Sequence, residues 1–64
     1  MPEAELWIRL NRHLGADYAP LWAQTFVIAD LGQLTVREAL DAGLKCKVIW
    51  RAVWAALELP PSEL

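Results

Sequence analysis

Two side chains in this 64-residue sequence are of types that often carry out chemistry, a histidine and a cysteine. His13 could act as a general base or a metal ligand, and Cys46 could act as a nucleophile between Lys45 and Lys47 near a helix start. Each is the only residue of its type, so neither a disulfide nor a structural zinc site is expected. We expect His13 at a helix border and Cys46 packed as a small hydrophobic residue, with no metal and no cofactor.

Larger catalytic arrangements are missing from the sequence. It contains no Ser-His-Asp order, no phosphate-cradling glycine loop and no pair of carboxylates that can be assigned to catalysis. A chain of 64 residues also leaves little room to enclose a substrate. We therefore expect a protein that is not an enzyme and has no small-molecule substrate.

The stretch from Thr35 to Val53 has the spacing of a DNA-binding helix-turn-helix. Ala39 is a small residue that would let two helices approach closely, and Gly43 supplies a positive φ at the turn. Leu44 and Ile49 are apolar at positions where that motif is apolar. Any short helix that ends in glycine and precedes a second helix would match about as well.

The acidic residue Glu38 and the negative net charge of the chain argue against sequence-specific DNA binding. Glu38 stands where the motif usually has an apolar residue, and the formal net charge of the chain is −2. Specific DNA binding usually draws on several phosphate contacts. Two interpretations remain open: two bundle helices with a solvated basic edge, or a nucleic-acid-binding module that uses Lys45, Lys47 and Arg51.

The composition indicates apolar surface that one small domain cannot bury. Hydrophobic residues make up 56% of the chain and charged residues 22%, against about 45–50% and about 25% in typical domains. Such a surplus favours self-association or a protein partner. No run of apolar residues is long enough to span a membrane and no signal peptide is apparent, so a cytoplasmic location is expected.

The elements that must position these residues are all helical by periodicity. Glycines and the Pro60–Pro61 pair divide the chain into four segments, which predicts an all-α compact bundle of four helices in a single domain, 1–64. The segments run over residues 2–14, 17–31, 35–42 and 45–59, with a helix-turn-helix-like second half and a frayed tail at 60–64. The third segment is short and opens with a predicted capping box between Thr35 and Glu38.

The predicted helix over 17–31 is apolar nearly all round, so we expect it at the centre of the bundle. Its predicted inward stripe consists of Tyr18, Leu21, Trp22, Thr25, Phe26, Ile28 and Ala29. Val27 and Leu31 lie outside that stripe, and Trp7 and Trp54 lie towards the edges of the stripes of their own helices. Tryptophan is frequent both in small cores and in protein interfaces. These four residues are therefore either core or a candidate protein interface.

Several short motifs together resemble a known family. The most specific are Leu31-Gly32, the stretch 35–40 followed by Gly43, and the stretch 50–53, and the similarity covers nearly the whole chain. In this order they resemble the actinobacterial family of short proteins known as domain of unknown function three thousand and forty-six. The sequence departs from that family at Gln33-Leu34, where Gly-Arg is usual, and at Lys45-Cys46, where an acidic residue or proline is usual.

The resemblance implies a small cytosolic helical protein without an established activity or ligand, often encoded near recombinase genes. We therefore expect a protein-protein interaction module that binds itself as a homodimer or a protein partner, with a link to DNA recombination or repair. The alternative is a helix-turn-helix-like nucleic-acid-binding module.

Overall fold

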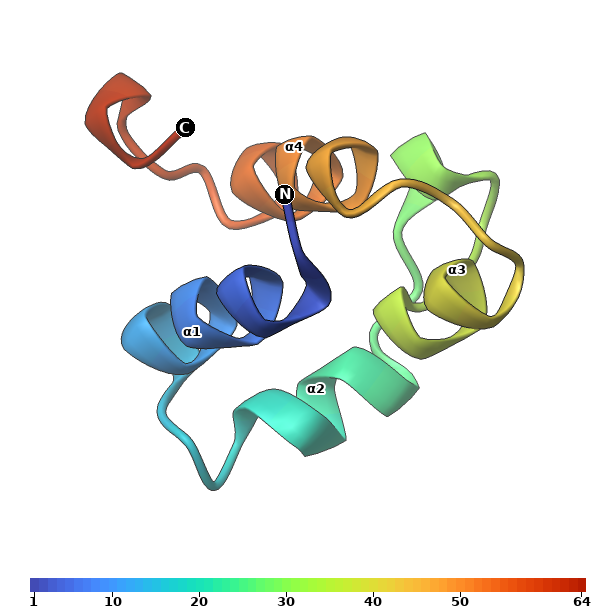
Figure 1. Cartoon of the computed structure of the whole chain (residues 1–64), viewed down its shortest axis with the longest axis horizontal. Helices are drawn as coiled ribbons and strands as arrows, with labels where there is room; N and C mark the ends of the chain where they lie inside the picture. Colours follow the sequence, from blue (N-terminus) through green and yellow to red (C-terminus); the bar gives the residue numbers. More distant parts are fainter.

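Four α-helices and two single-turn 3-10 helices form the chain, and the computed structural model describes all 64 residues (Figure 1). The only strand-like feature is one antiparallel bridge between Ile28 and Leu34. This confirms the predicted all-α class. The elements are α1 (Glu3–Leu14), α2 (Ala19–Thr25), η1 (Ala29–Leu31), α3 (Val36–Asp41), α4 (Cys46–Ala56) and η2 (Pro61–Glu63).

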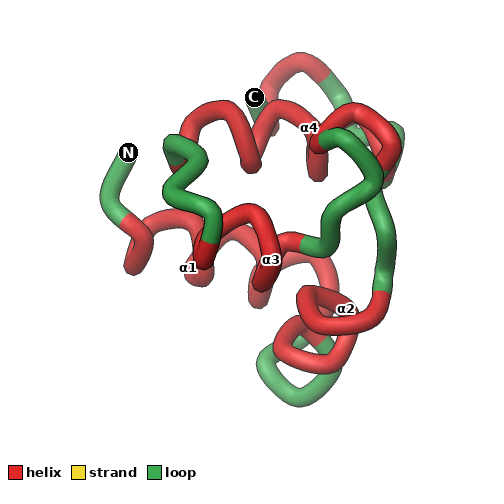
Figure 2. Tube along the Cα trace, turned by 90° about the vertical axis from the view of Figure 1, so that its right-hand side faces the viewer, coloured by secondary structure: helices red, strands yellow, loops and turns green.

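The helices surround one core, to which every α-helix contributes (Figures 1 and 2). α1 packs against α2 and α4, and α3 packs against the same two helices. The radius of gyration is 10.5 Å, close to the value of about 10.7 Å expected for a compact chain of this length. The buried apolar residues are Leu6, Leu10, Ala19, Trp22, Ala23, Ile28, Leu31, Val36, Ala39, Ile49, Trp50, Ala52 and Val53.

Helix α1 follows the usual rules for charge along a helix. Glu3 and Glu5 lie in its first turn and Arg12 and His13 in its last, so both ends complement the helix dipole. Gly15 ends the helix with a φ of 88°, which costs glycine little because it has no Cβ. With 12 residues α1 is the longest helix, and no helix is long and apolar enough to cross a membrane.

Helix α3 has only six residues and depends on its cap. The Glu38 N–H donates to Thr35 Oγ1 at 3.1 Å, and the Thr35 N–H donates to Glu38 Oε1 at 2.9 Å. This reciprocal pair is the capping box that the sequence predicts. Val36 and Ala39 are fully buried and fix the helix against its neighbours.

The predicted long helix over 17–31 is wrong. α2 spans only Ala19–Thr25, its N-cap is Tyr18 without a side-chain cap bond, and Phe26 is already extended. Thr25, Val27 and Ile28 are β-branched and Phe26 is aromatic, and such residues lose side-chain freedom in a helix. The Ile28 N–H instead donates to the Leu34 carbonyl at 2.9 Å, so the chain leaves the helix for a loop that folds back on itself.

Because α2 ends at Thr25, Leu31 lies in a different element from the one predicted. The 3-10 helix η1 turns this side chain into the core, where only 6% of its surface is exposed. Leu31 is therefore not available as the interface residue that a continuous helix would make it. Tyr18 and Leu21, expected on the inward stripe, are about half exposed, since the side of α2 that faces the core carries Ala19, Trp22 and Ala23.

The C-terminal residues are ordered by contacts rather than frayed. α4 ends at Ala56, earlier than predicted, and residues 61–63 form η2. The carbonyl groups of Pro60 and Glu63 accept hydrogen bonds from the indole N–H groups of Trp54 and Trp50, at 2.8 Å and 3.0 Å. The tail therefore packs over α4.

Replacing Thr35 by alanine removes the side-chain half of the capping box. We expect the free energy of unfolding to fall by about 1 kcal/mol, and the melting temperature by about 4–8 °C. Thr25→Ala is the control, because that hydroxyl is exposed and only donates to the Leu21 carbonyl within α2. Urea unfolding of both variants checks this, and equal losses would contradict a special role for the cap.

Candidate protein interface

The four tryptophans differ in their surroundings, and only two are fully core residues. Trp22 and Trp50 are buried. Trp7 and Trp54 are partly buried against the core, with Trp7 Nε1 donating to Glu3 Oε2 at 3.2 Å. The Arg37 guanidinium lies over the Trp7 ring at 5.6 Å, which places that indole between α1 and α3.

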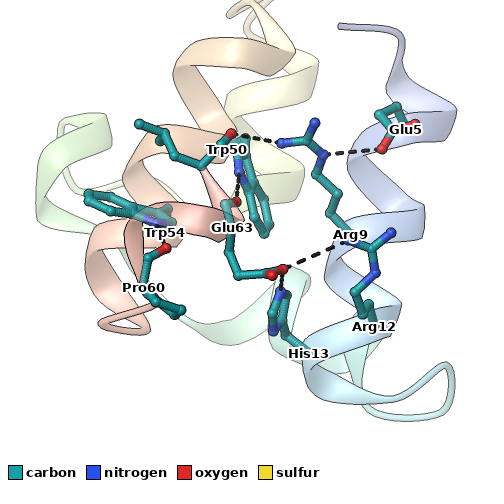
Figure 3. Close-up of polar contacts among 9 residues, drawn as sticks. Glu5, Arg9, Arg12, His13, Trp50, Trp54, Pro60 and Glu63 are labelled. Atoms are coloured by element: carbon teal, nitrogen blue, oxygen red, sulfur yellow. Dashed lines mark hydrogen bonds and ion pairs between the residues drawn. The ribbon is translucent and has the colours of Figure 1, made fainter.

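Trp50 joins α1, α4 and the tail (Figure 3). The Arg9 guanidinium lies over its ring at 5.5 Å, and the Arg9 Nη1 donates to the Leu64 carbonyl at 2.9 Å. The Arg9 Nε also donates to Glu5 Oε2 at 3.1 Å. The Arg9 side chain therefore connects α1 with Trp50 of α4 and with the C-terminal tail.

His13 belongs to the same group of contacts (Figure 3). Its Nε2 lies 2.9 Å from Glu63 Oε1, its ring stacks on Trp50 at 6.0 Å, and Arg12 Nη1 lies 3.8 Å from the same carboxylate. The polar contact of His13 therefore joins α1 to the tail. No three His, Cys, Asp or Glu side chains come close enough together to hold a metal ion, and Cys46 packs against the core.

An apolar groove lies where residues 26–30 run beside α4. It has a volume of about 310 Å³, and Asp30 is the only polar residue in its wall. Phe26 and Val27 remain 44% and 51% exposed, although both are large and apolar. We call this feature the α4 groove, and its walls are Phe26, Val27, Ile28, Ala29, Asp30, Ala52, Ala55 and Ala56.

A second depression continues the α4 groove along the helix. It shares Asp30, Ala52 and Ala55 with the groove and adds Val48, Arg51 and Trp54. Two of the predicted interface residues, Val27 and Trp54, therefore border one continuous surface. Trp7 lies outside it under Arg37, and Leu31 is buried.

The basic residues predicted for nucleic-acid contact are all exposed at the N-terminal half of α4. None of the three lies within ion-pair distance of a carboxylate, since the ion pairs of the structure involve only Arg9, Arg12 and His13. The α3–α4 pair keeps the tight turn at Gly43, with a φ of 83°. The free basic residues are Lys45, Lys47 and Arg51.

The residues of this surface that the sequence analysis did not predict include Phe26, Val48 and Ala55. Phe26 was assigned to an inward helical stripe that does not exist, because α2 ends before it. Val48 and Ala55 are seven residues apart and fall on one side of α4, opposite the buried Ile49 and Val53. This seven-residue spacing in the sequence predicts that both side chains lie on the same side of the helix.

Glu63→Ala tests how strongly the tail is held. The variant removes the carboxylate contacted by His13 and Arg12, and we expect the free energy of unfolding to fall by about 0.5–1 kcal/mol, a range suited to partly exposed ion pairs. Ser62→Ala is the control, since Ser62 is exposed in the same 3-10 helix. The difference between the variants should shrink near 1 M salt, and a loss that is equal in both would contradict the docking role.

Comparison with known proteins gives one match. No curated protein and no solved structure matches the chain significantly. The match is to a family described as "Protein of unknown function (DUF3046)", and it covers residues 1–62. Because that range includes all four α-helices and nearly the whole chain, the chain belongs to this family.

Proposed function

We propose that this protein is a protein-binding module and that the α4 groove is its binding surface. The observation that carries the proposal is the exposure of Phe26 and Val27 beside the alanines of α4. Apolar side chains gathered in one place on a small domain are typical of contact surfaces.

The walls of the groove suit a protein better than a small molecule. Small-molecule sites usually combine an enclosed apolar cavity with several polar groups that fix the orientation of the ligand. The α4 groove has one polar residue, Asp30, and seven apolar ones, and it continues into a neighbouring depression. We therefore propose binding rather than catalysis, with no cofactor.

The surface is also formed by the chain on its own. The Ile28–Leu34 bridge fixes one wall, and the buried Ile49, Trp50 and Val53 fix α4, which forms the other. A preformed surface loses less conformational entropy on binding. We place this activity in the cytoplasm, and the family resemblance supports a link to DNA recombination.

Site-specific photocrosslinking tests the proposal in living cells of the natural host. A photoreactive amino acid at Val27 should form discrete crosslinked protein products, because Val27 borders the groove. The matched control is the same amino acid at Ile8, which lies on α1 and is 53% exposed against 51% for Val27. Products at both positions, or at neither, would contradict the α4 groove as the binding surface.

One observation favours a second candidate function, nucleic-acid binding. Lys45, Lys47 and Arg51 are exposed and carry no intramolecular ion pair. Lys45 is the N-cap of the second helix of a helix-turn-helix-like pair, and Lys47 and Arg51 lie in that helix. The second helix is the one that reads the major groove in DNA-binding proteins.

Lys47→Glu separates this candidate from the first. If the basic face contacts phosphates, the variant should weaken duplex binding and reduce the slope of log affinity against log salt concentration by about one or more. Arg37→Glu changes the net charge equally, but Arg37 lies on α3 over Trp7. Fluorescence anisotropy at low salt measures both, and an absence of binding by the unaltered chain would exclude the second candidate.

A further inference from the structure

We propose that the occupant of the α4 groove is a second copy of this chain, packed with the two α4 helices antiparallel. This inference rests on the proposed function, since it names the partner of that surface. Charges at the two ends of α4 carry it.

Helix α4 has charges that oppose its own dipole. Its N-terminal half bears Lys45, Lys47 and Arg51, its first turn has no acidic residue, and its last turn has no basic one. Beyond its C-terminus stands Glu58, where a negative charge is unfavourable. α1 shows the opposite and favourable order, so the reversed order in α4 is not general to this chain.

Glu58 is also placed where glycine would be easier to accommodate. The Leu59 N–H donates to the Trp54 carbonyl and the Glu58 N–H donates to the Ala55 carbonyl, a Schellman ending in which Glu58 has a φ of 54°. α3 ends with the same two hydrogen bonds, and there Gly43 takes the left-handed position. A glutamate held in this conformation, exposed and without an ion pair, points to a use for its carboxylate.

The spacing of Arg51 and Glu58 makes the surface complementary to itself. Arg51 lies within α4 and Glu58 is the second residue beyond its end, so a positive and a negative charge stand on the two sides of a midpoint between Trp54 and Ala55. A two-fold axis between Trp54 and Ala55 brings each Arg51 opposite Glu58 of the second copy. Lys47 follows one turn further along the same side, and the two helix dipoles run antiparallel.

The same axis brings the apolar walls together. The α4 residues of the groove are Ala52, Ala55 and Ala56, which centre on the axis position, so residues 26–30 of the two copies meet there as well. A stable interface needs about 800 Å² from each partner, roughly a fifth of the 3987 Å² surface of the chain. α4 alone is too narrow for this, and the exposed Phe26 and Val27 extend the surface.

Charge reversal with restoration tests the arrangement. Sedimentation equilibrium of the full chain from about 1 to about 500 µM should show the mass rising from 7.2 kDa towards twice that value. Arg51→Glu and Glu58→Arg should each raise the dissociation constant by about tenfold or more, because each places like charges opposite one another twice. The double variant should return to within about threefold of the unaltered chain, since the pairs are restored in reverse.

Two further variants separate the interface from folding effects. Arg37→Glu, with the same charge change on α3, should associate like the unaltered chain. Glu58→Gly should raise the urea midpoint of the dilute monomer by relieving the left-handed strain, and should still weaken association. Normal association of Glu58→Gly, or a double variant weaker than both single ones, would overturn the proposed pairing.

The outcome also separates this inference from the proposed function. A chain that stays monomeric while Val27 crosslinks to a larger protein overturns the second copy and leaves the protein-binding function standing. Duplex binding that Arg51→Glu abolishes in a monomeric chain would assign the basic end of α4 to nucleic acid and also overturn it. A crosslinked product of twice 7.2 kDa supports both.

Discussion

The burial of the Trp50 indole is the interaction on which the rest of the structure depends. A tryptophan of this kind removes about 150–250 Å² from water, worth about 4–6 kcal/mol before entropy is counted. Arg9 and His13 of α1 cover its ring, and its N–H donates to the Glu63 carbonyl of the tail. A small domain without disulfides therefore joins its two ends through one side chain of α4.

This arrangement explains why α4 has two different sides. The inner side of α4 packs into the core and contacts the tail. The cations that contact the tail, Arg9 and Arg12, belong to α1. The basic residues of α4 itself have no such partner within the chain. What remains on the outer side of α4 is an apolar strip with unpaired charges beside it, and the proposed binding of another molecule rests on that combination.

Local signals in the sequence predicted the fold well, and long-range contacts were beyond them. The Thr35–Glu38 capping box and the glycine stops at 15 and 43 are short-range features, and the structure has them as predicted. The end of α2 was missed because apolar periodicity hides the poor helix propensity of residues 25–28. The tail was missed because Leu64 and Glu63 are held by partners 55 and 50 residues away, which no local pattern reports.

The candidate interface was predicted in part for the same physical reason. Trp54 and Val27 border the surface found in the structure. Leu31 is buried instead, because the helix expected to carry it ends at Thr25. The ending of that helix is also what creates the surface, because a continuous helix over 17–31 would carry Phe26 inward. The β-branched run therefore does more than end α2. It lays residues 26–30 along α4 with Ile28 buried and with Phe26 and Val27 exposed, and the groove exists because the helix stops.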